Sequence, residues 1–412
     1  MNFELFIAKR IIGNKTYKSS VSAPIIKIGI TAIAIGIIVM LIAIATGFGL
    51  QQKIRDKVSA FNGHIVIENY DTNASDESQN PISTKPDFQK NVIAIDGVNH
   101  VQGVASKFTV IRTTEEFEGV VIKGVGKDYR WTYFEEFLVE GRLPNYSEGL
   151  NNEVLVSTYL TNRMNLKVGD SFESLFVNGA DFDQLPRQRK FEIVGVYNSG
   201  FQELDEKYVI ADIRHIQRLN KWKKNQVGNY EVFIDDFRQL EQKTVEVHDT
   251  VDRNLKAVSV KEKFYTIFEW IKIFDNNTYI IIAIMILVAG INMITALLVL
   301  ILERTQMIGI LKALGTDNWS IRKVFLYNAS YLIGLGLLWG NLIGLGLLLA
   351  QKYFKLFPLN PETYYVTEAP VYLAWDYIIA LNVGTFVIAL LMLLIPSVII
   401  SMISPVKAIR FD

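Results

Sequence analysis

The residue types that most often do chemistry in proteins are few in this chain and widely separated. The sequence contains no cysteine, which excludes disulfides and thiolate metal sites. Two pairs of carboxylates, Glu115-Glu116 and Glu135-Glu136, are adjacent in sequence and therefore point to different sides of a strand or helix. A solvated surface is favoured over catalysis for both pairs. The four histidines are too far apart to form a metal-binding spacing: His64, His100, His215 and His248.

Motifs for nucleotide and hydrolytic chemistry are also absent from the sequence. The segment Gly119–Gly124 has the glycine spacing of a phosphate-binding loop but lacks the Lys-Ser/Thr pair that grips phosphate and magnesium. Neither H-E-x-x-H nor G-x-S-x-G occurs. The sequence therefore predicts no catalytic residue, no metal site and no cofactor in this chain, and we expect it not to be an enzyme.

The elements that dominate the chain are four long apolar runs. Half of all residues are hydrophobic, and the formal net charge is zero, so nothing points to nucleic acid. Each run is long enough to cross a hydrocarbon core as a helix. None has an ionisable residue in its middle, which argues against a proton-coupled carrier. The runs are about Ile28–Leu50, Tyr279–Leu302, Val324–Ala350 and Tyr377–Ile403.

The distribution of Lys and Arg predicts how the chain crosses the membrane. Basic residues gather before the first run, between the second and third runs, and in the tail, so we expect these parts to face the cytoplasm. The first run is interpreted as an uncleaved signal anchor. The predicted fold is an α/β membrane protein, with four transmembrane helices and a large α+β domain inserted between helices 1 and 2. The predicted spans are residues 25–50, 278–302, 324–351 and 377–403. The outer domain is predicted in three parts: 51–111, an inserted strand-rich subdomain at 112–199, and 200–277, which includes a stalk. The remaining parts are an interfacial helix at 1–24, a cytoplasmic loop helix at 303–323, an irregular outer loop at 352–376 and a tail at 404–412.

The region between the first two runs alternates strand-like and helix-like segments. Its first and last parts have a β-α-β pattern, with helices near Asp87–Ile95 and Arg214–Trp222. Its middle part is rich in strands, among them Ser171–Val177 and Phe191–Tyr197. Residues Val177–Arg189 between these two strands are predicted to form a protruding hairpin, because an Asn-Gly pair stands at a turn-forming position.

Helical patterns extend beyond two of the spans and form predicted stalks. The first continues to about Phe61, and another runs from Lys261 to Phe274 straight into the second span. At the other end, Phe3 and Ile7 belong to an apolar stripe typical of an interfacial helix. Small residues spaced by four let another helix approach the third span closely: Gly336, Gly340 and Gly344. Amides within the spans each need a partner: Asn292, Asn328, Asn341 and Asn382.

The loop between the second and third runs has a helical pattern of its own. Met307, Ile308, Leu311 and Leu314 recur at a spacing that places them on one face. Gly315 follows where a helix end favours positive φ. Such a helix, pinned between two spans, is suited to receive force from a soluble partner, although an ordinary interfacial helix has the same pattern. The next helix has side-chain oxygens available for its cap: Asp317, Asn318 and Ser320.

This loop, Glu303–Gly315, reads ER…MIGILKALG and resembles the coupling-helix motif of ABC-transporter permeases in the FtsX/MacB/LolC–LolE superfamily. The stretches VEGRLP…NEVLVSTYLTNRMNLKVGDSF and FEIVGVYNSGFQELDEKYVIADI look like consecutive segments of LolC/LolE outer domains, and the tail is similar to their P-x-x-A-x-R ending. The resemblance implies that the loop docks on a separate, LolD-like ATPase, which binds ATP and magnesium. The residues implied for this coupling are Glu303, Arg304, Met307, Ile308, Gly309, Leu311, Lys312, Leu314 and Gly315.

The resemblance also implies a place and a task for the protein. It implies a bacterial inner-membrane protein with cytoplasmic termini and a periplasmic domain, paired with a second permease chain as a homodimer or a LolC/LolE-like heterodimer. The ATPase would drive a lipoprotein out of the outer leaflet to a LolA-like periplasmic carrier, for sorting to the outer membrane. The two permease chains would flank a central cavity, lined by the apolar faces of Ile28–Leu50 and Lys261–Leu302. A P-x-Q-R loop hooks the carrier in LolC, which implies contacts here at Phe182, Pro186, Arg187 and Arg189, although the motif is short and an exposed hairpin without a partner has the same pattern.

Two alternatives remain open within the same superfamily. A MacB-like exporter would move drugs or peptides, and such chains usually carry a fused ATPase domain. An FtsX-like signal transmitter moves no substrate and activates a cell-wall hydrolase, but its outer domain is typically smaller than the one predicted here. Lipoproteins that accumulate in the inner membrane after depletion would favour the releasing system, whereas a cell-separation defect with normal sorting would favour the transmitter.

Overall fold

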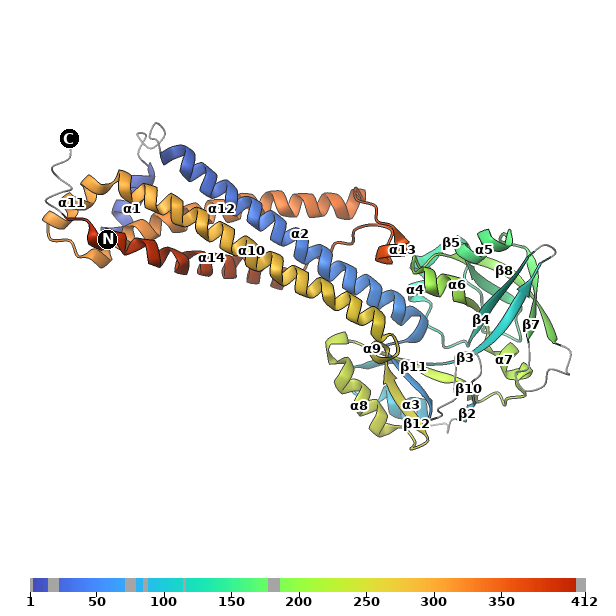
Figure 1. The fold of residues 1–412 in the computed structure, drawn as a ribbon. Helices are drawn as coiled ribbons and strands as arrows, with labels where there is room; N and C mark the ends of the chain where they lie inside the picture. Colours follow the sequence, from blue (N-terminus) through green and yellow to red (C-terminus); the bar gives the residue numbers. More distant parts are fainter. Residues whose placement is uncertain are drawn as a thin grey trace. The chain divides into compact units, whose positions relative to one another are not determined.

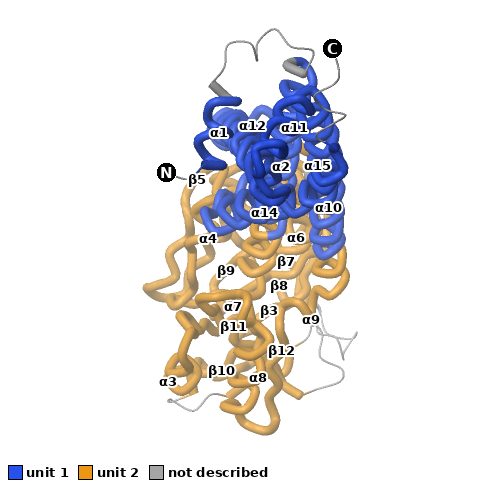
Figure 2. Tube along the Cα trace, turned by 90° about the vertical axis from the view of Figure 1, so that its left-hand side faces the viewer, with its two compact units in different colours: residues 1–51, 271–358, 369–412 blue, residues 52–270, 359–368 orange. Residues whose placement is uncertain are grey.

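The computed structural model describes residues 3–13, 22–70, 79–83, 88–113, 116–176 and 186–404. The chain divides into two compact units (Figure 2). We call residues 1–51, 271–358 and 369–412 the helical unit, and residues 52–270 and 359–368 the sheet unit. The chain passes from the first unit to the second within one helix, α2 (Ser22–Asn62).

Four helices of the structure are long and apolar enough to cross a membrane (Figure 1). They are α2, α10 (Tyr265–Glu303), α12 (Asn318–Phe354) and α14 (Trp375–Ser397). The four predicted spans are therefore confirmed as helices. Three shorter helices belong to the same unit: α1 (Phe3–Gly13), α11 (Thr305–Ala313) and α15 (Ile399–Met402).

Helices α2 and α12 pack closely because glycine leaves room between them. A Cβ atom added to Gly336 would stand 2.7 Å from the Cβ of Ile33, and one added to Gly340 would stand 2.8 Å from the Cβ of Ile37. Gly344 meets the same helix one turn further on, with Leu41 Cδ1 3.0 Å from the added atom. The glycines predicted for helix packing thus lie along one line of contact with α2.

The sheet unit is built on a single ten-stranded sheet, in the order β12-β1-β11-β3-β4-β9-β6-β8-β5, with β7 paired to β3 and β8. Neighbouring strands are antiparallel except for β4 with β9 and β6 with β8. The strands are β1 (Ile65–Asn69), β3 (Val98–Arg112), β4 (Phe117–Val125), β5 (Leu138–Gly141), β6 (Glu153–Ser157), β7 (Ser171–Phe176), β8 (Arg187–Tyr197), β9 (Tyr208–Asp212), β11 (Asn229–Ile234) and β12 (Leu255–Ser259). A separate small sheet joins β2 (Ile82–Ser83) to β10 (Gln226–Val227).

Short helices accompany the sheet (Figure 1), most of them between its strands along the chain, whereas α9 follows the last strand and α13 lies between α12 and α14. They are α3 (Phe88–Ile93), α4 (Thr132–Phe137), α5 (Thr158–Met164), α6 (Gln202–Lys207), α7 (Ile213–Leu219), the 3-10 turn Phe237–Gln239, α8 (Leu240–Thr250), α9 (Val260–Lys263) and α13 (Pro361–Tyr364). The strands of the predicted middle subdomain and of its flanking parts hydrogen-bond into the same sheet, since β4 pairs with β3 on one side and with β9 on the other.

Three local expectations differ from the structure. The second stalk is not continuous from Lys261, because Ser259 caps a separate short helix, α9, and Phe264 leaves helical geometry before α10 begins. The outer loop is not wholly irregular, since it contains α13. The fourth span reaches Met402, close to its predicted end, but it is not one helix: α14 stops one residue after Pro396, and α15 follows as a separate turn.

Candidate functional site

The loop between α10 and α12 forms the short helix α11, as its sequence predicts. Gly315 adopts a φ of +90°, and this left-handed conformation ends the helix as expected. The carboxylate of Asp317 then accepts hydrogen bonds from the backbone N–H groups of Trp319 and Ser320, at 3.0 and 3.1 Å, and so caps α12. The bonds with Ser320 lower the pKa of Asp317. The end of α11 and the start of α12 are thus fixed by specific local features.

The apolar residues of α11 do not all share one face. Ile308 and Gly309 are buried, and Met307 and Leu311 pack against the core of the helical unit. Leu314 was predicted to join them, but it follows the end of the helix and is 76% exposed. The surface open to a partner is instead made by Glu303, Gln306, Ile310, Leu314 and Gly315. Of the predicted coupling residues, Arg304 is half-buried at the start of the helix.

Lys312 is turned toward its own helical unit and away from that open surface. Its ammonium donates hydrogen bonds to the backbone carbonyls of Ile400, Ser401 and Ile403, at 2.7, 3.3 and 2.8 Å. Carbonyls at a helix end have no partner within the helix, and an ammonium has three hydrogens to offer. Partial burial lowers the pKa of this lysine. Lys312 therefore fastens α11 to the end of α15.

Helix α1 packs beside the start of α12, the end of that helix predicted to face the cytoplasm. Its Ala8 and Ile11 pack on Val324, and the carboxylate of Glu4 lies 3.6 Å from the ammonium of Lys323. Large apolar side chains on its other side are exposed, among them Phe3, which is 49% exposed. Such a helix, with one packed face and one apolar exposed face, fits the predicted position at a membrane interface.

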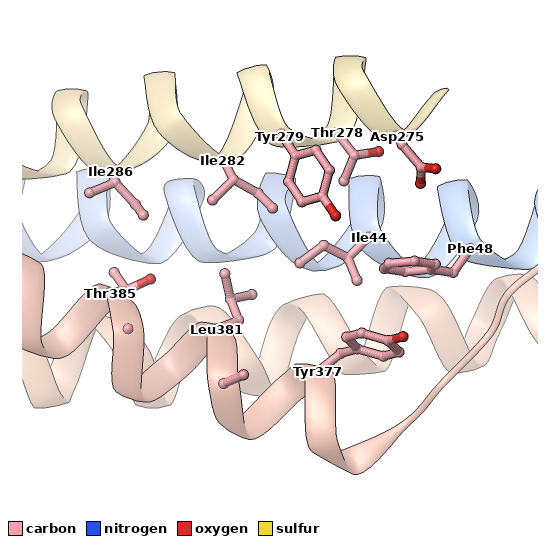
Figure 3. Close-up of a pocket in the computed structure, with 12 residues that line it drawn as sticks. Ile44, Phe48, Asp275, Thr278, Tyr279, Ile282, Ile286, Tyr377, Leu381 and Thr385 are labelled. Carbon is pink, nitrogen blue, oxygen red and sulfur yellow. The ribbon is translucent and has the colours of Figure 1, made fainter. Parts of the chain in front are cut away.

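An apolar pocket of about 260 Å³ lies within the helical unit, between α2, α10 and α14 (Figure 3). At one end, the rings of Phe48 and Tyr377 stack with centroids 4.5 Å apart, and Asp275 accepts a hydrogen bond from the Gln51 amide. The far end is Thr385, eight residues and about 12 Å further along α14. The Thr385 hydroxyl is buried and has no hydrogen-bond partner among the described residues. The walls between the two ends are mainly aliphatic: Ile44, Ile282, Ile286, Ala380, Leu381 and Gly384.

The amides predicted within the spans have unequal surroundings. Asn341 on α12 and Asn382 on α14 exchange two side-chain hydrogen bonds, of 2.6 and 3.0 Å. Asn292 donates only to the carbonyl of Val288 in its own helix. Asn328 is buried, and neither of its side-chain polar atoms has a partner among the described residues. Two of the four amides therefore tie α12 to α14 by bonding to each other.

The predicted hook falls at the base of a hairpin. Phe182 lies outside the described residues, and Pro186 is exposed. Arg187 and Arg189 were expected in a protruding loop, but both belong to β8 and pair with β7. The strand was predicted from Phe191, and its first four residues were missed because they are polar, so no apolar run marks them. The guanidinium of Arg187 donates to the backbone carbonyl of Leu219, at 2.8 Å.

Two of the four histidines, His64 and His215, are largely buried in the sheet unit. Burial lowers the pKa of His64 to about 4, with the charge of Arg130 adding to the effect, and burial also lowers the pKa of His215. Within the described parts of the chain, no three His, Cys, Asp or Glu side chains are grouped so that they could hold a metal ion.

Two polar residues of consequence carried no sequence signal. Lys57 lies inside the predicted first stalk and Tyr365 inside the loop expected to be irregular, yet the Lys57 ammonium donates to the Tyr365 carbonyl at 2.8 Å. The two are separated by 308 residues, so no local pattern could pair them.

Four helices long and apolar enough to span a membrane, a sheet unit inserted between the first two of them, and a capped short helix between α10 and α12 make up the described chain. A family model for the MacB-like periplasmic core domain matches residues 28–254, and a model for the FtsX-like permease C-terminal region matches residues 279–405. The chain belongs to the FtsX/MacB family of ABC-transporter permeases.

Named relatives are similar over nearly the whole length. The lipoprotein-releasing system transmembrane protein LolC of Buchnera aphidicola (subspecies Schizaphis graminum) is 21% identical, over 95% of this chain and 94% of its own. LolE of Haemophilus influenzae is 20% identical, over 96% of both chains. Among solved structures, the periplasmic region of MacB from Actinobacillus actinomycetemcomitans is 14% identical and covers 49% of this chain and 91% of its own, with a TM-score of 0.34.

Proposed function

We propose that this chain is the permease subunit of a lipoprotein-releasing ABC transporter of the bacterial inner membrane. A separate LolD-like ATPase, which binds ATP and magnesium, would dock on α11, and a second permease chain would complete the transporter. The substrate would be an acylated lipoprotein in the outer leaflet, passed to a LolA-like carrier. Support comes from the near full-length similarity to LolC and LolE, at about one-fifth identity.

The observation that carries the lipid substrate is the apolar pocket of the helical unit. Its volume of about 260 Å³ is smaller than the roughly 300–1,000 Å³ of pockets for drug-sized ligands, so it suits part of an acyl chain. Its walls are mainly aliphatic, and the larger polar groups, among them Asp275 and Tyr377, stand at one end, while the Thr385 hydroxyl stands at the other. Each CH2 transferred from lipid to water is worth about 0.8 kcal/mol, so releasing several chains requires ATP.

The surface that would receive the ATPase follows from the burial of α11. Ile310 and Leu314 are exposed and apolar, whereas Ile308 and Gly309 are buried in the helical unit. A charge at Leu314 would therefore disturb docking alone, and a charge at Gly309 would disturb the fold as well. On the sheet unit, the carrier would approach the start of β8, at Pro186 and Arg189.

Filling the pocket tests the lipid substrate directly. Gly384 lines the pocket and has open space where a side chain would begin, as does Gly346 on α12, which is not among the pocket residues. Gly384→Leu should lower ATP-driven lipoprotein release by about tenfold, because the new side chain occupies the space of the acyl chain, whereas Gly346→Leu should leave it near the wild-type rate. Release is measured as the transfer of a labelled triacylated lipoprotein from proteoliposomes to soluble carrier.

Equal release by the two variants would remove the pocket from the substrate path. The exporter and transmitter alternatives are tested in cells. Depletion of this chain should leave outer-membrane lipoproteins stranded in the inner membrane. Normal sorting together with a cell-separation defect would replace lipoprotein release by signal transmission, and normal sorting together with drug sensitivity would replace it by export.

A further inference from the structure

The loop between α12 and α14 belongs by its contacts to the sheet unit, although the helices on both sides of it belong to the helical unit. Residues 359–368 cluster with the sheet unit, and their flanks up to Pro358 and from Ala369 do not. The N–H of Leu359 donates to the carbonyl of Thr367 and closes the loop at its base. Val366 is 4% exposed, so the loop buries an apolar side chain. It is a specific docked element of the sheet unit.

The side chain of Tyr365 anchors this loop. Its ring stacks on Phe201, with centroids 4.5 Å apart and planes 14° from parallel. Trp270 meets the same ring edge-on, at 5.3 Å and 90°. Tyr365 also adopts a φ of +57°, a conformation that a tyrosine takes only when its surroundings hold it there. Three distant parts of the chain therefore meet at one side chain.

The backbone of Tyr365 is held as well, by a buried cation. Lys57, 8% exposed, comes from α2 and donates to the Tyr365 carbonyl. The lysine lies near Asp205, which is also buried and accepts a 2.6 Å hydrogen bond from the Ser199 hydroxyl. A buried charge that loses its partner is destabilising, so this contact resists separation. We call the contacts of Tyr365 with Lys57, Phe201 and Trp270 the loop clamp.

The opposite end of the α12–α14 hairpin is fastened by Lys312. The lysine joins α11 to three carbonyls at and after the end of α15, so α11 is bonded to the chain that leads back into α14. The covalent chain already joins α11 to α10 and α12. The hydrogen bonds of Lys312 also connect α11 to α14, the spanning helix that no loop joins to α11.

We infer that α14 is a second transmission route: a push on α11 passes through Lys312 to α14, and from α14 through the loop clamp to the sheet unit. This route works beside the one through the stalks, α2 and α10. It rests on the proposed function only in that α11 receives the push of an ATPase. Lys312 and Tyr365 are then positioning residues that set how much movement the sheet unit receives for each ATP consumed.

The test uses the full transporter in proteoliposomes, with its ATPase. Lys312→Met keeps the aliphatic stem and removes the three donors, and Tyr365→Asn removes the ring while tolerating the left-handed backbone. Each should lower the amount of lipoprotein released per ATP at least threefold while the ATPase stays bound. The matched controls are Lys352→Met and Tyr364→Asn, whose side chains are exposed, and both should match the wild type.

The double variant gives the sharper result. Two breaks in one route act in series, so Lys312→Met with Tyr365→Asn should lose no more than the more severe single variant. The route would be overturned if the double variant lost release by the product of the two single losses, or if each single variant released as much lipoprotein per ATP as the wild type. Lys57→Met breaks the loop clamp from its other side and replaces Tyr365→Asn if that variant fails to assemble.

A readout without substrate separates this inference from the proposed function. Hydrogen exchange of the sheet unit, measured with and without ATP, reports its movement whatever the chain transports. The variants should reduce the ATP-dependent change at least threefold. An unaltered change would overturn the second route, whereas a wild type that shows the change but releases no lipoprotein would overturn the proposed substrate and leave the route standing.

Discussion

The two units of the molecule hold their buried polar groups in different ways. In the sheet unit, Lys123 and Glu231 are each 2% exposed and form an ion pair, to which Gln102 adds a hydrogen bond on the carboxylate. In the helical unit, Asn341 and Asn382 join two spans through a neutral, half-buried amide pair, and near one end of the pocket the carboxylate of Asp275 accepts a hydrogen bond from Gln51. A fully bonded buried ion pair cannot lose one partner without a large penalty, whereas amide bonds between membrane helices are weak.

This difference suits two mechanical roles. The sheet unit is a body whose internal polar network would be broken by any rearrangement, so it is built to move as a whole. The helical unit is held by close approach of α2 and α12 at glycine and by exchangeable amide contacts, so its helices can shift against each other. Four substitutions, taken from the largest expected effect to the smallest, measure the contrast.

The first is Lys123→Met in the sheet unit. It leaves Glu231 buried without its cation and should lower the free energy of unfolding by about 3–5 kcal/mol. The control is Arg163→Met, because Arg163 pairs with Glu118 at an exposed position and such pairs are worth about 0–1 kcal/mol. Urea unfolding of the purified full chain, followed by tryptophan fluorescence, measures both. Equal losses in the two variants would show that the buried pair does not hold the unit.

The second concerns pH and His64. Its folded pKa, about 4, lies below the ordinary value of 6.5, so the neutral ring stabilises the sheet unit fully above pH 6.5, and this contribution is lost as the pH falls toward 4. The loss amounts to about 2–3 kcal/mol. Burial raises the pKa of Asp205 to about 6, so the protonation of this carboxyl stabilises the folded protein as the pH falls below 6 and partly offsets the loss from His64. The difference between wild type and His64→Phe isolates the histidine.

The measurement is the urea midpoint of each protein at pH 7 and at pH 4.5. The wild type should lose more stability than His64→Phe on acidification. A parallel fall in both proteins would mean that His64 is protonated in the folded state without penalty.

The third tests the close contact of the helical unit. Gly340→Leu places a Cβ 2.9 Å from the backbone carbonyl oxygen of Ala34 and should force α2 and α12 apart, at about 1–3 kcal/mol. Gly346→Leu, on the same helix in open space, is the control. Thermal unfolding in detergent compares the melting temperatures of the two variants with that of the wild type. A wild-type melting temperature for Gly340→Leu would contradict the observed contact.

The fourth and smallest is Asn382→Leu. It removes the amide pair with Asn341 and should cost about 0.6–2 kcal/mol, in keeping with the modest worth of such bonds between membrane helices. Asn292→Leu, which loses a bond only within its own helix, should be close to neutral. A loss for Asn382→Leu as large as that for Lys123→Met would erase the difference between the units.

The sequence predicts the parts of this molecule that local patterns determine. The spans follow from apolar runs, the end of α11 follows from Gly315, and the start of α12 follows from the Asp317 cap. The start of β8 escaped because its polar residues alternate without an apolar run, and the break at Phe264 escaped because helical spacing continues across it. The direction of Lys312 depends on carbonyls almost ninety residues away, which no local pattern reveals.

The most direct test of the account is whether a separate ATPase drives this chain to release a lipoprotein. Purified chain, its partner ATPase and a triacylated lipoprotein are placed in proteoliposomes, and transfer to soluble carrier is measured with ATP. The account predicts ATP-dependent transfer that needs the ATPase and is lost in Leu314→Asp, whose side chain lies on the exposed surface beside α11. Nucleotide hydrolysis by the chain alone, or wild-type transfer by Leu314→Asp, would contradict it.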